Sequence, residues 1–316
     1  MGEPGVVTAS PLYGGIEAGG TKFVCAVGQA PQAIQTSTVI LTTTPTATLN
    51  QVIAFFRPYS IQSLGLATFG PIDLAPGSAT YGHILSTPKI AWQACPIVDI
   101  LQTALGVPVV AETDVNAAAL AEALYGAGQG CDPVVYLTVG TGIGGGAAIH
   151  GRPLHGLMHP EMGHMLLARA PGDTRPSSCP FHDDCLEGLA SGHAIRARFG
   201  EPETLPPEHE AWTLEAVYLG QALATIVTIL SPQRIIIGGG VMHQPHMLPR
   251  IREACARALH GYLPRLKALS DFEAYIVAPA LGDRAGVIGA LHLAQEVCCR
   301  PFMRDDVRGA PAAPES

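Results

Sequence analysis

The sequence has 316 residues, of which 47% are hydrophobic and 14% charged, and this composition excludes an intrinsically disordered chain. Its length allows one large domain or two lobes with a core in each. A net charge of −8 without a basic arm or stripe argues against a nucleic-acid partner. The N-terminus lacks the features of a signal peptide, and the apolar stretch at 222–230 is too short to span a bilayer. We therefore expect a soluble, cytoplasmic protein with no membrane partner.

The first part of the chain alternates strands with glycine turns and helices. Residues 13–28 (YGGIEAGGTKFVCAVG) predict a strand, a tight glycine turn and a returning strand. We expect a helix at 47–57, a buried strand ending in a Gly-Pro turn at 63–71, and another strand at 107–112. The last strand runs into TDVNAAALAEALYGAG, whose alanine, leucine and glutamate content and terminal glycines predict a helix.

The second part begins with the same device, because residues 133–151 (PVVYLTVGTGIGGGAAIHG) again predict a strand, a glycine turn and a strand. An ordered but irregular insertion rich in His, Pro, Gly and Cys follows at 152–186. The remaining expected elements are helices at 187–199 and 213–230, a strand at 234–240, a helix at 246–262, a strand at 275–280 and a helix at 285–298. The tail at 301–316 is expected to be disordered.

The two hairpins, GIEAGGTKFVCAV and LTVGTGIGGGAAI, echo each other and suggest two related lobes that face a cleft. We expect residues 1–116 with 285–300 to form one lobe. Residues 117–284 would form a larger lobe that carries the insertion at 152–186.

Glycine turns let the backbone approach a ligand closely and present several N–H groups to an anion. Thr21, Lys22 and Thr141 add hydroxyl and ammonium donors at these turns. The stretch GTGIGG at 140–145 satisfies G-x-G-x-x-G, but the dinucleotide fingerprint requires a helix inside the motif, and here a strand continues. A third cluster, GGGV at 238–241, would suit a nucleoside. Any one turn can be an ordinary hairpin, but together they predict binding of nucleotide phosphates.

The segment ETDVN (112–116) places Asp114 and Asn116 at the carboxyl end of a strand and the start of a helix, where α/β sheets bind ligands. One interpretation makes Asp114 a helix N-cap. The functional interpretation is that Asp114 accepts the proton of a substrate hydroxyl, with Asn116 hydrogen-bonding the same polyol. This suits phosphoryl transfer, in which positioning and charge neutralisation do most of the work.

The segment CPFHDDC supplies three metal ligands within one loop, and a histidine lies fifteen residues upstream. Tetrahedral Zn²⁺ with two cysteines and two histidines follows, and four protein ligands close the site, which makes the zinc structural. The predicted ligands are His164, Cys179, His182 and Cys185. Asp183 or Asp184 could replace one ligand, free thiols are a further alternative, and a cytoplasmic location argues against a disulfide.

In order along the chain, the motifs resemble those of the ROK family of sugar kinases, and most closely its zinc-containing bacterial fructokinase branch. The resemblance spans about residues 12–297 and rests on EAGGTK (17–22), FGPID (69–73), TPK (87–89), TDVNAAAL, GTGIGGG, HPEMGH (159–164), LEGLASG (186–192) and IIGGGV (236–241). It implies an α/β, actin-like and hexokinase-like (ribonuclease H-like) two-lobe fold whose cleft binds ATP and Mg²⁺, and a homodimer. The wider family usually has Asp where this chain has Glu17, whose role is left open.

The resemblance also implies roles for individual residues. Asp114 becomes the general base. The nucleotide side comprises Gly19, Gly20, Thr21, Lys22, Gly140, Thr141, Gly142, Gly188, Gly238, Gly239 and Gly240. The sugar pocket comprises Gly70, Pro71, Pro88, Lys89, Asn116, Glu161 and Glu187.

The expected reaction is ATP-dependent phosphorylation of a hexose at its 6-hydroxyl, with D-fructose giving D-fructose 6-phosphate. Phosphorylation of mannose, glucose or an N-acetylhexosamine is the alternative within the family. A non-catalytic sugar sensor is disfavoured by Asp114 and the two phosphate hairpins, and a zinc hydrolase is disfavoured by the closed zinc site.

Overall fold

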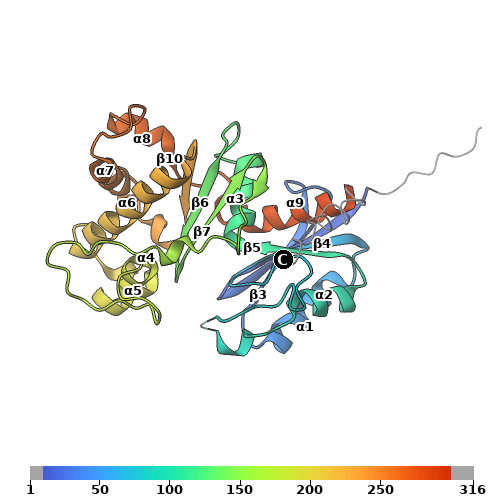
Figure 1. Cartoon of the computed structure of the whole chain (residues 1–316). Coiled ribbons are helices and arrows are strands. Elements are labelled where there is room, and N and C mark those ends of the chain that lie inside the picture. The colour runs from blue at the N-terminus through green and yellow to red at the C-terminus, as the bar shows by residue number, and fades with distance from the viewer. Residues whose placement is uncertain (1–9, 88, 300–316) are drawn as a thin grey trace, which may run out of the picture. The chain divides into compact units, whose positions relative to one another are not determined.

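The computed structural model describes residues 10–87 and 89–299, and this part of the chain divides into two compact units. One unit comprises residues 10–114 and 286–299, and the other comprises Val115–Ala285. Pro88, predicted to line the sugar pocket, and the tail at 301–316 lie outside the described residues. Each unit combines a five-stranded sheet with helices, so the predicted α/β class is confirmed (Figure 1).

The sheet of the first unit has the strand order β3-β2-β1-β4-β5. Its first three strands are antiparallel neighbours, and β4 and β5 continue in parallel from β1. Three α-helices accompany these strands. The elements are β1 (Leu12–Ala18), β2 (Lys22–Gly28), β3 (Ile34–Leu41), α1 (Pro45–Phe56), β4 (Ile61–Thr68), η1 (Ile90–Trp92), α2 (Ile97–Leu105), β5 (Val109–Thr113) and α9 (Ala285–Cys299).

Alternation along β1 determines which helices cover each face of the first sheet. Ile16 belongs to the apolar cluster that also contains residues of α1 and α2. Gly15 points the other way, where a Cβ would lie 2.7 Å from Leu291 of α9. A side chain at Gly65 on β4 would overlap the Ala290 carbonyl of the same helix. These two glycines therefore let the backbone of α9 pack directly on the sheet.

The sheet of the second unit has the order β10-β9-β6-β7-β8. It repeats the arrangement of the first sheet, because β6, β7 and β8 are antiparallel neighbours while β9 and β10 continue in parallel from β6. The strands are β6 (Val134–Val139), β7 (Ile143–Ile149), β8 (Arg152–Pro153), β9 (Arg234–Gly238) and β10 (Ile276–Val277). The internal echo between the two glycine hairpins is thus a repeat of a whole sheet topology.

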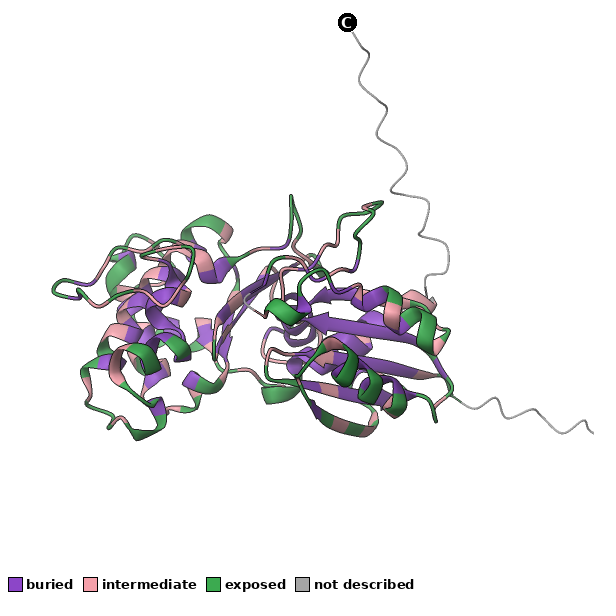
Figure 2. Ribbon diagram, turned by 90° about the horizontal axis from the view of Figure 1, so that it is seen from below, coloured by how far each residue is buried: buried purple, intermediate pink, exposed green. Residues whose placement is uncertain are grey.

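The helices of the second unit are α3 (Asp114–Tyr125, which begins at the last residue of the first unit), α4 (Leu186–Ala190), α5 (Gly192–Phe199), α6 (Glu210–Leu230), α7 (Met247–Leu259) and α8 (Leu269–Tyr275). Short 3₁₀ turns are η2 (Met162–His164), η3 (Pro202–Thr204), η4 (Gly240–His243) and η5 (Gly282–Arg284). The buried residues are concentrated on the strands and on one side of the helices (Figure 2).

Several predicted elements differ from the structure. The single helix expected at 187–199 is two helices, because Ser191 leaves the helical conformation and its side chain accepts a hydrogen bond from Ala194 N at 3.1 Å as the cap of α5. The strand expected at 275–280 covers only Ile276–Val277. Sequence patterns gave no indication of β3, α2 or α8. In β3, polar and half-exposed residues alternate at the sheet edge, so no apolar run marks this strand.

The apolar stretch at 222–230 is the second half of a longer helix, since α6 begins at Glu210 and has 21 residues. By length and composition α6 is the one helix of the described residues that could cross a bilayer. However, 56% of its apolar window is buried inside the protein, and Trp212, Leu219 and Leu223 belong to the core of the second unit. We therefore treat α6 as a core helix.

A buried carboxyl group on α6 predicts a pH-dependent stability. Glu215 is 2% exposed, and its Oε1 has no hydrogen-bond partner among the described residues. Burial raises the pKa of Glu215 well above its ordinary value of 4.5, although Arg198 opposes the shift. As pH rises above 4.5, the folded state retains a proton that the unfolded state releases, so stability falls with pH.

We predict that Glu215→Gln flattens this slope of melting temperature against pH and raises the melting temperature at pH 7 by roughly 2–4 °C. Thermal unfolding followed by circular dichroism between pH 4.5 and pH 7 measures the effect, because that window begins at the ordinary pKa of a glutamate. The exposed Glu208→Gln is the matched control and should keep the wild-type slope. An unchanged slope in Glu215→Gln would contradict the prediction.

Candidate phosphate turns, sugar residues and metal centre

The first glycine turn joins β1 to β2, and its carbonyl groups are held by a residue from another strand. Thr42, which follows β3, donates its N–H to Thr21 O at 2.9 Å and its hydroxyl to Gly19 O at 2.8 Å. Gly19 N donates across the turn to Lys22 O at 2.9 Å. Within the described chain, the N–H groups of Gly20 and Thr21 have no partner. Two adjacent N–H donors are therefore available to an anion.

The second glycine turn joins β6 to β7 and has the same pattern. Gly140 N donates across the turn to Gly142 O at 2.9 Å. The start of α5 holds the other carbonyls, since Gly192 N donates to Gly140 O at 2.7 Å and His193 N donates to Thr141 O at 3.2 Å. Among the residues that the structure describes, nothing accepts from the N–H groups of Thr141 and Gly142. Both predicted phosphate turns thus present a pair of open donors.

Glu187 on α4 supports the second turn. Its Oε2 accepts a hydrogen bond from Ile143 N at 2.8 Å, directly after the turn, and would lie 2.6 Å from a Cβ at Gly142. Gly142 therefore has no room for a side chain while this carboxylate remains in place. The predicted contact of Glu187 with the sugar stays a prediction, because the structure contains no sugar.

The three glycines after β9 differ in their surroundings. A Cβ at Gly238 would lie 2.8 Å from Pro279 Cγ and from Tyr136 Oη, and one at Gly239, whose φ is +94°, would lie 2.5 Å from Val139 O. Both positions require glycine for packing inside the unit. Gly240 has open space instead, with no protein atom within 4 Å of a Cβ. The predicted nucleoside contact is therefore best supported at Gly240.

Asp114 and Asn116 lie where the sequence predicted them, at the end of β5 (Val109–Thr113) and in the first turn of α3. Asn116 is fully buried, and its Oδ1 accepts from Ala147 N at 3.1 Å while its Nδ2 donates to Leu154 O at 3.3 Å. The amide therefore joins α3 to β7 and the residues beyond it. Its predicted contact with the sugar stays a prediction, as does the role of Asp114.

The predicted sugar-binding loop after β4 is organised by an acidic residue that the sequence did not single out. Asp73 accepts hydrogen bonds from the hydroxyls of Ser78 at 2.5 Å and Thr80 at 2.6 Å, and these bonds hold the pKa of its carboxyl below the ordinary value. Gly70 and Pro71 lie at the start of this loop, and Leu85 N donates to Pro71 O at 2.7 Å. The loop is thus fixed at both ends in the first unit.

Glu161 and Glu187 both belong to the second unit. Glu161 precedes η2, its side chain is 47% exposed, and its Oε1 lies 3.4 Å from Nδ1 of the buried His159. Partial burial raises the pKa of the Glu161 carboxyl, with an added contribution from the negative charge of Glu187 and an opposing one from His164. The two carboxylates are thus close enough to repel each other.

Glu17, whose role the sequence left open, accepts a hydrogen bond from Val287 N at 3.1 Å through its Oε2. Val287 lies in the first turn of α9, where a carboxylate is favourable because of the helix dipole. A Cβ at the neighbouring Gly286 would lie 2.5 Å from Glu17 Cδ. Glu17 therefore anchors the start of α9 to β1.

The four predicted metal ligands converge in the structure. The ligand atoms of His164, Cys179, His182 and Cys185 all lie within 4.8 Å of one another. Cys179 Sγ is 3.8 Å from His164 Nδ1 and 3.7 Å from His182 Nδ1, and Cys185 Sγ is 3.7 Å from His164 Nδ1. Ideal tetrahedral Zn²⁺ with these donor types places sulfur and nitrogen about 3.6 Å apart, so the cluster fits a zinc ion.

The surroundings of the two thiols also fit a metal. Gly188 N donates to Cys185 Sγ and Phe181 N donates to Cys179 Sγ, both at 3.4 Å. Burial raises the pKa of the Cys185 thiol to about 11, so a divalent cation must displace its proton on binding. In the described chain this is the one group of three or more His, Cys, Asp or Glu side chains that could hold a metal.

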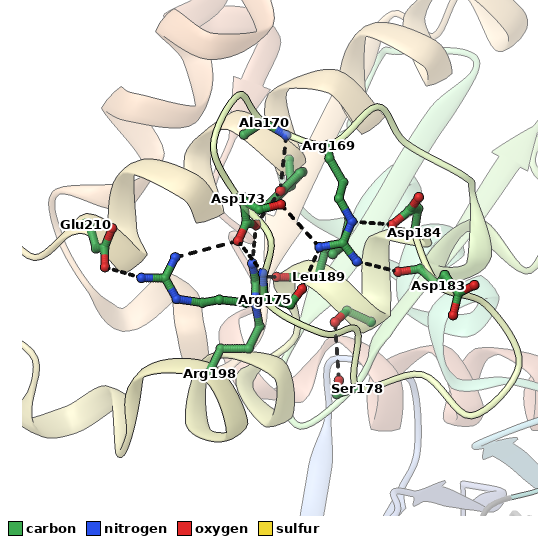
Figure 3. A network of polar contacts seen from close by, with 12 residues as sticks. Arg169, Ala170, Asp173, Arg175, Ser178, Asp183, Asp184, Leu189, Arg198 and Glu210 are labelled. Atoms are coloured by element: carbon green, nitrogen blue, oxygen red, sulfur yellow. Dashed lines mark hydrogen bonds and ion pairs between the residues drawn. The ribbon is translucent and has the colours of Figure 1, made fainter.

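Arg169 forms hydrogen bonds to several residues of the loop that carries Cys179 and Cys185. Arg169 donates from Nε to Asp184 Oδ1 at 2.6 Å, and from its other nitrogens to Asp183 O at 3.0 Å and Arg175 O at 2.5 Å (Figure 3). The Asp184 carboxylate is therefore engaged by a guanidinium, and neither aspartate belongs to the ligand cluster. The alternative in which Asp183 or Asp184 replaces a ligand is not supported.

A buried ionic group fixes the same loop to the core. The Asp173 carboxylate is fully buried and accepts hydrogen bonds from Arg198 and from the Tyr218 hydroxyl (Figure 3). Burial alone would raise the pKa of Asp173, but these hydrogen bonds hold it below its ordinary value. Arg175 reaches the same carboxylate and also pairs with Glu210 at the start of α6.

Gly188 was predicted to contact the nucleotide. It is buried in α4, where a Cβ would overlap Ser177 Oγ and lie 2.8 Å from Cys179 Cβ. Because Gly188 has no side chain, the loop that contains Ser177 and Cys179 can pack directly against α4. Its role in nucleotide binding stays a prediction.

The comparisons with known proteins agree with these features. Residues 13–297 match the ROK family. The chain belongs to the ROK family. A protein from Bacillus subtilis named as a putative fructokinase is 46% identical over 298 residues, which cover 94% of this chain and 100% of the relative.

Two further proteins are similar in sequence or structure. A fructokinase from Zymomonas mobilis is 44% identical over 293 residues, or 90% of this chain and 96% of the relative. The crystal structure of a ROK glucokinase from Streptomyces griseus in complex with glucose and AMPPNP superposes with a TM-score of 0.72 at 26% identity, covering 90% of this chain and 99% of that chain. Fold class and family are therefore as the sequence predicted.

A pair of glycine variants tests the second turn. Gly140 has no protein atom within 4 Å of a Cβ, so Gly140→Ala should fold with an unchanged melting temperature but raise the KM for ATP about 10-fold or more, because the methyl group takes the space of the ligand. Gly142→Ala is the comparison, and it should lower the melting temperature as well, because its methyl group displaces Glu187. Steady-state kinetics and thermal unfolding check both, and wild-type kinetics in Gly140→Ala would contradict the assignment.

Removal of a metal ligand should release the metal and lower the stability of the protein. We predict that the wild type contains about one zinc ion per chain by mass spectrometry, and that Cys179→Ser loses it and unfolds at a lower temperature. The part-buried Cys131→Ser, outside the cluster, is the control and should retain the metal. Wild-type metal content and melting temperature in Cys179→Ser would show that Cys179 does not hold the zinc.

Proposed function

We propose that this ROK protein is a fructokinase that transfers the γ-phosphoryl group of ATP to the 6-hydroxyl of D-fructose. The observation that carries the proposal is the pair of glycine turns, each with two adjacent N–H groups that lack a partner among the described residues. The 44% identity to the Zymomonas mobilis fructokinase supports fructose as the acceptor, and the AMPPNP complex of the Streptomyces griseus protein supports a nucleoside triphosphate as the donor.

Asp114 is the proposed general base. Its position in the first turn of α3 favours the ionised carboxylate through the helix dipole, so the group is ready to accept a proton. The 6-hydroxyl oxygen attacks the γ-phosphorus, the bond from that phosphorus to the bridging oxygen breaks, and ADP leaves. The proton of the hydroxyl goes to Asp114. No covalent enzyme intermediate is required.

The N–H pairs of the two turns are the proposed ligands of the ATP phosphates. Gly20 and Thr21 belong to the first unit, and Thr141 and Gly142 belong to the second. Because Thr42, Gly192 and His193 already bond the turn carbonyls, the turns need not rearrange to donate. Such preorganised donors stabilise charge that develops on a phosphoryl group.

Mg²⁺ would arrive with ATP, since it retains several waters and binds mainly through substrate phosphates. When bound, it neutralises charge on the β- and γ-phosphates. We assign zinc to the cluster of His164, Cys179, His182 and Cys185, where it would be structural because four protein ligands leave no open position. A homodimer is retained as a proposal from the family resemblance. A cytoplasmic location and lobes bounded at 1–116 with 285–300 and at 117–284 are also retained as proposals.

The activity is tested by coupling ADP release to pyruvate kinase and lactate dehydrogenase with fructose, mannose, glucose and N-acetylglucosamine as acceptors. We predict the highest kcat/KM for D-fructose, and no turnover with any hexose would overturn the proposed function.

For the base, we predict that Asp114→Asn lowers kcat by about 100-fold or more while the calorimetric affinity for fructose stays within a few-fold of wild type. The exposed Asp99→Asn on α2 is the matched control and should keep wild-type kcat. An active Asp114→Asn variant would remove Asp114 from the mechanism.

A further inference from the structure

Lys89 was assigned to the sugar pocket by resemblance, but its side chain lies on the first glycine turn. A Cβ at Gly20 would be 2.8 Å from Lys89 Cε and 3.7 Å from Lys89 Nζ. The aliphatic stem therefore crosses the space that any side chain at position 20 would take. This brings the ammonium group to the same turn whose Gly20 and Thr21 N–H groups have no partner in the described chain.

The backbone around Lys89 is fixed to the segment that holds the turn. Trp92 N donates to Lys89 O at 2.8 Å, and the indole Nε1 of Trp92 donates to Thr43 O at 2.8 Å. Trp92 is 1% exposed and packs against Phe23. Thr43 directly follows Thr42, which holds the turn carbonyls. One short chain of contacts thus positions Lys89 relative to the turn.

Among the described residues, no acidic side chain pairs with Lys89. Lys89 is half-buried, and no carboxylate lies within 4.0 Å of its ammonium group among the residues that the structure describes. A cation without a partner, next to two free N–H donors, is a binding site for an anion with several charged oxygens. A neutral sugar hydroxyl would use neither the positive charge nor the paired donors.

We propose that Lys89, together with the N–H groups of Gly20 and Thr21, binds the phosphoryl group that is transferred, as the γ-phosphate of ATP and then as the phosphate of the product. This inference rests on the proposed function and specifies one of its residues. In the transfer step, the bond forms between the sugar oxygen and phosphorus, the bond to the ADP oxygen breaks, and the proton goes to Asp114. The ammonium group offsets the charge on the transferred group.

The test compares Lys89→Met, which keeps the length of the side chain without its charge, with Lys89→Arg and with Lys267→Met at an exposed position. Calorimetry measures the affinities for fructose, fructose 6-phosphate, ADP and ATP, and steady-state assays measure kcat. We expect Lys89→Met to bind fructose and ADP as the wild type does. We expect it to bind fructose 6-phosphate about 10-fold more weakly, to lose the preference for ATP over ADP, and to lower kcat about 10- to 100-fold. Lys89→Arg should restore part of each loss, and Lys267→Met should behave as wild type.

A double-mutant cycle with Gly20→Ala adds a readout that a general structural defect would not give. The methyl group at position 20 displaces the Lys89 stem, so Gly20→Ala should lower kcat in the wild type and have little further effect in Lys89→Met. Additive losses would contradict the inference. The inference would also be contradicted if Lys89→Met bound fructose more weakly but kept the preference for ATP over ADP, because that result would assign Lys89 to the sugar. If the wild type phosphorylated no hexose, this result would count against the proposed function alone. The affinities of the wild type and of Lys89→Met for ATP and ADP test the role of Lys89 separately.

Discussion

In both glycine turns, hydrogen bonds from a second element hold the turn carbonyls, and two adjacent N–H groups have no partner in the part of the chain that the structure describes. Thr42 provides these bonds in the first unit, and the first residues of α5 provide them in the second. A turn held in this way keeps its shape while two of its N–H donors remain available to an anion. The site proposed for phosphate depends on this single arrangement, repeated on two sheets of the same topology.

The metal centre is connected to the second turn through α4. Cys185 caps this helix, accepting a hydrogen bond from Gly188 N, and Glu187 in the same helix holds Ile143 N beside the turn. The loop with Cys179 packs on α4 at Gly188. A zinc ion with four protein ligands would therefore contribute to the geometry of the phosphate turn without taking part in chemistry. The ionic contacts of Arg169 and Asp173 fix the same loop from its other side.

Features that depend on neighbouring residues could be predicted from the sequence. Both glycine hairpins, the helix that begins at Asp114 and the convergence of Cys179, His182 and Cys185 with His164 follow from local spacing. Contacts between distant segments could not be predicted. The hydroxyl of Thr42 meets a carbonyl 23 residues earlier, and nothing in a run of threonines distinguishes it from the cap that Thr44 provides for α1. The edge strand β3 was missed for a related reason, because its polar alternation matches no buried pattern.

The central claim is that the four unpaired N–H groups bind the phosphates of ATP. The most direct measurement is a ¹⁵N–¹H spectrum of the full chain, labelled selectively in glycine and threonine, with and without Mg-AMPPNP and fructose. The account predicts that the amide resonances of Gly20, Thr21, Thr141 and Gly142 shift most, while that of Gly106 at the end of α2 remains in place. Saturation with nucleotide that leaves these four resonances unchanged would contradict it.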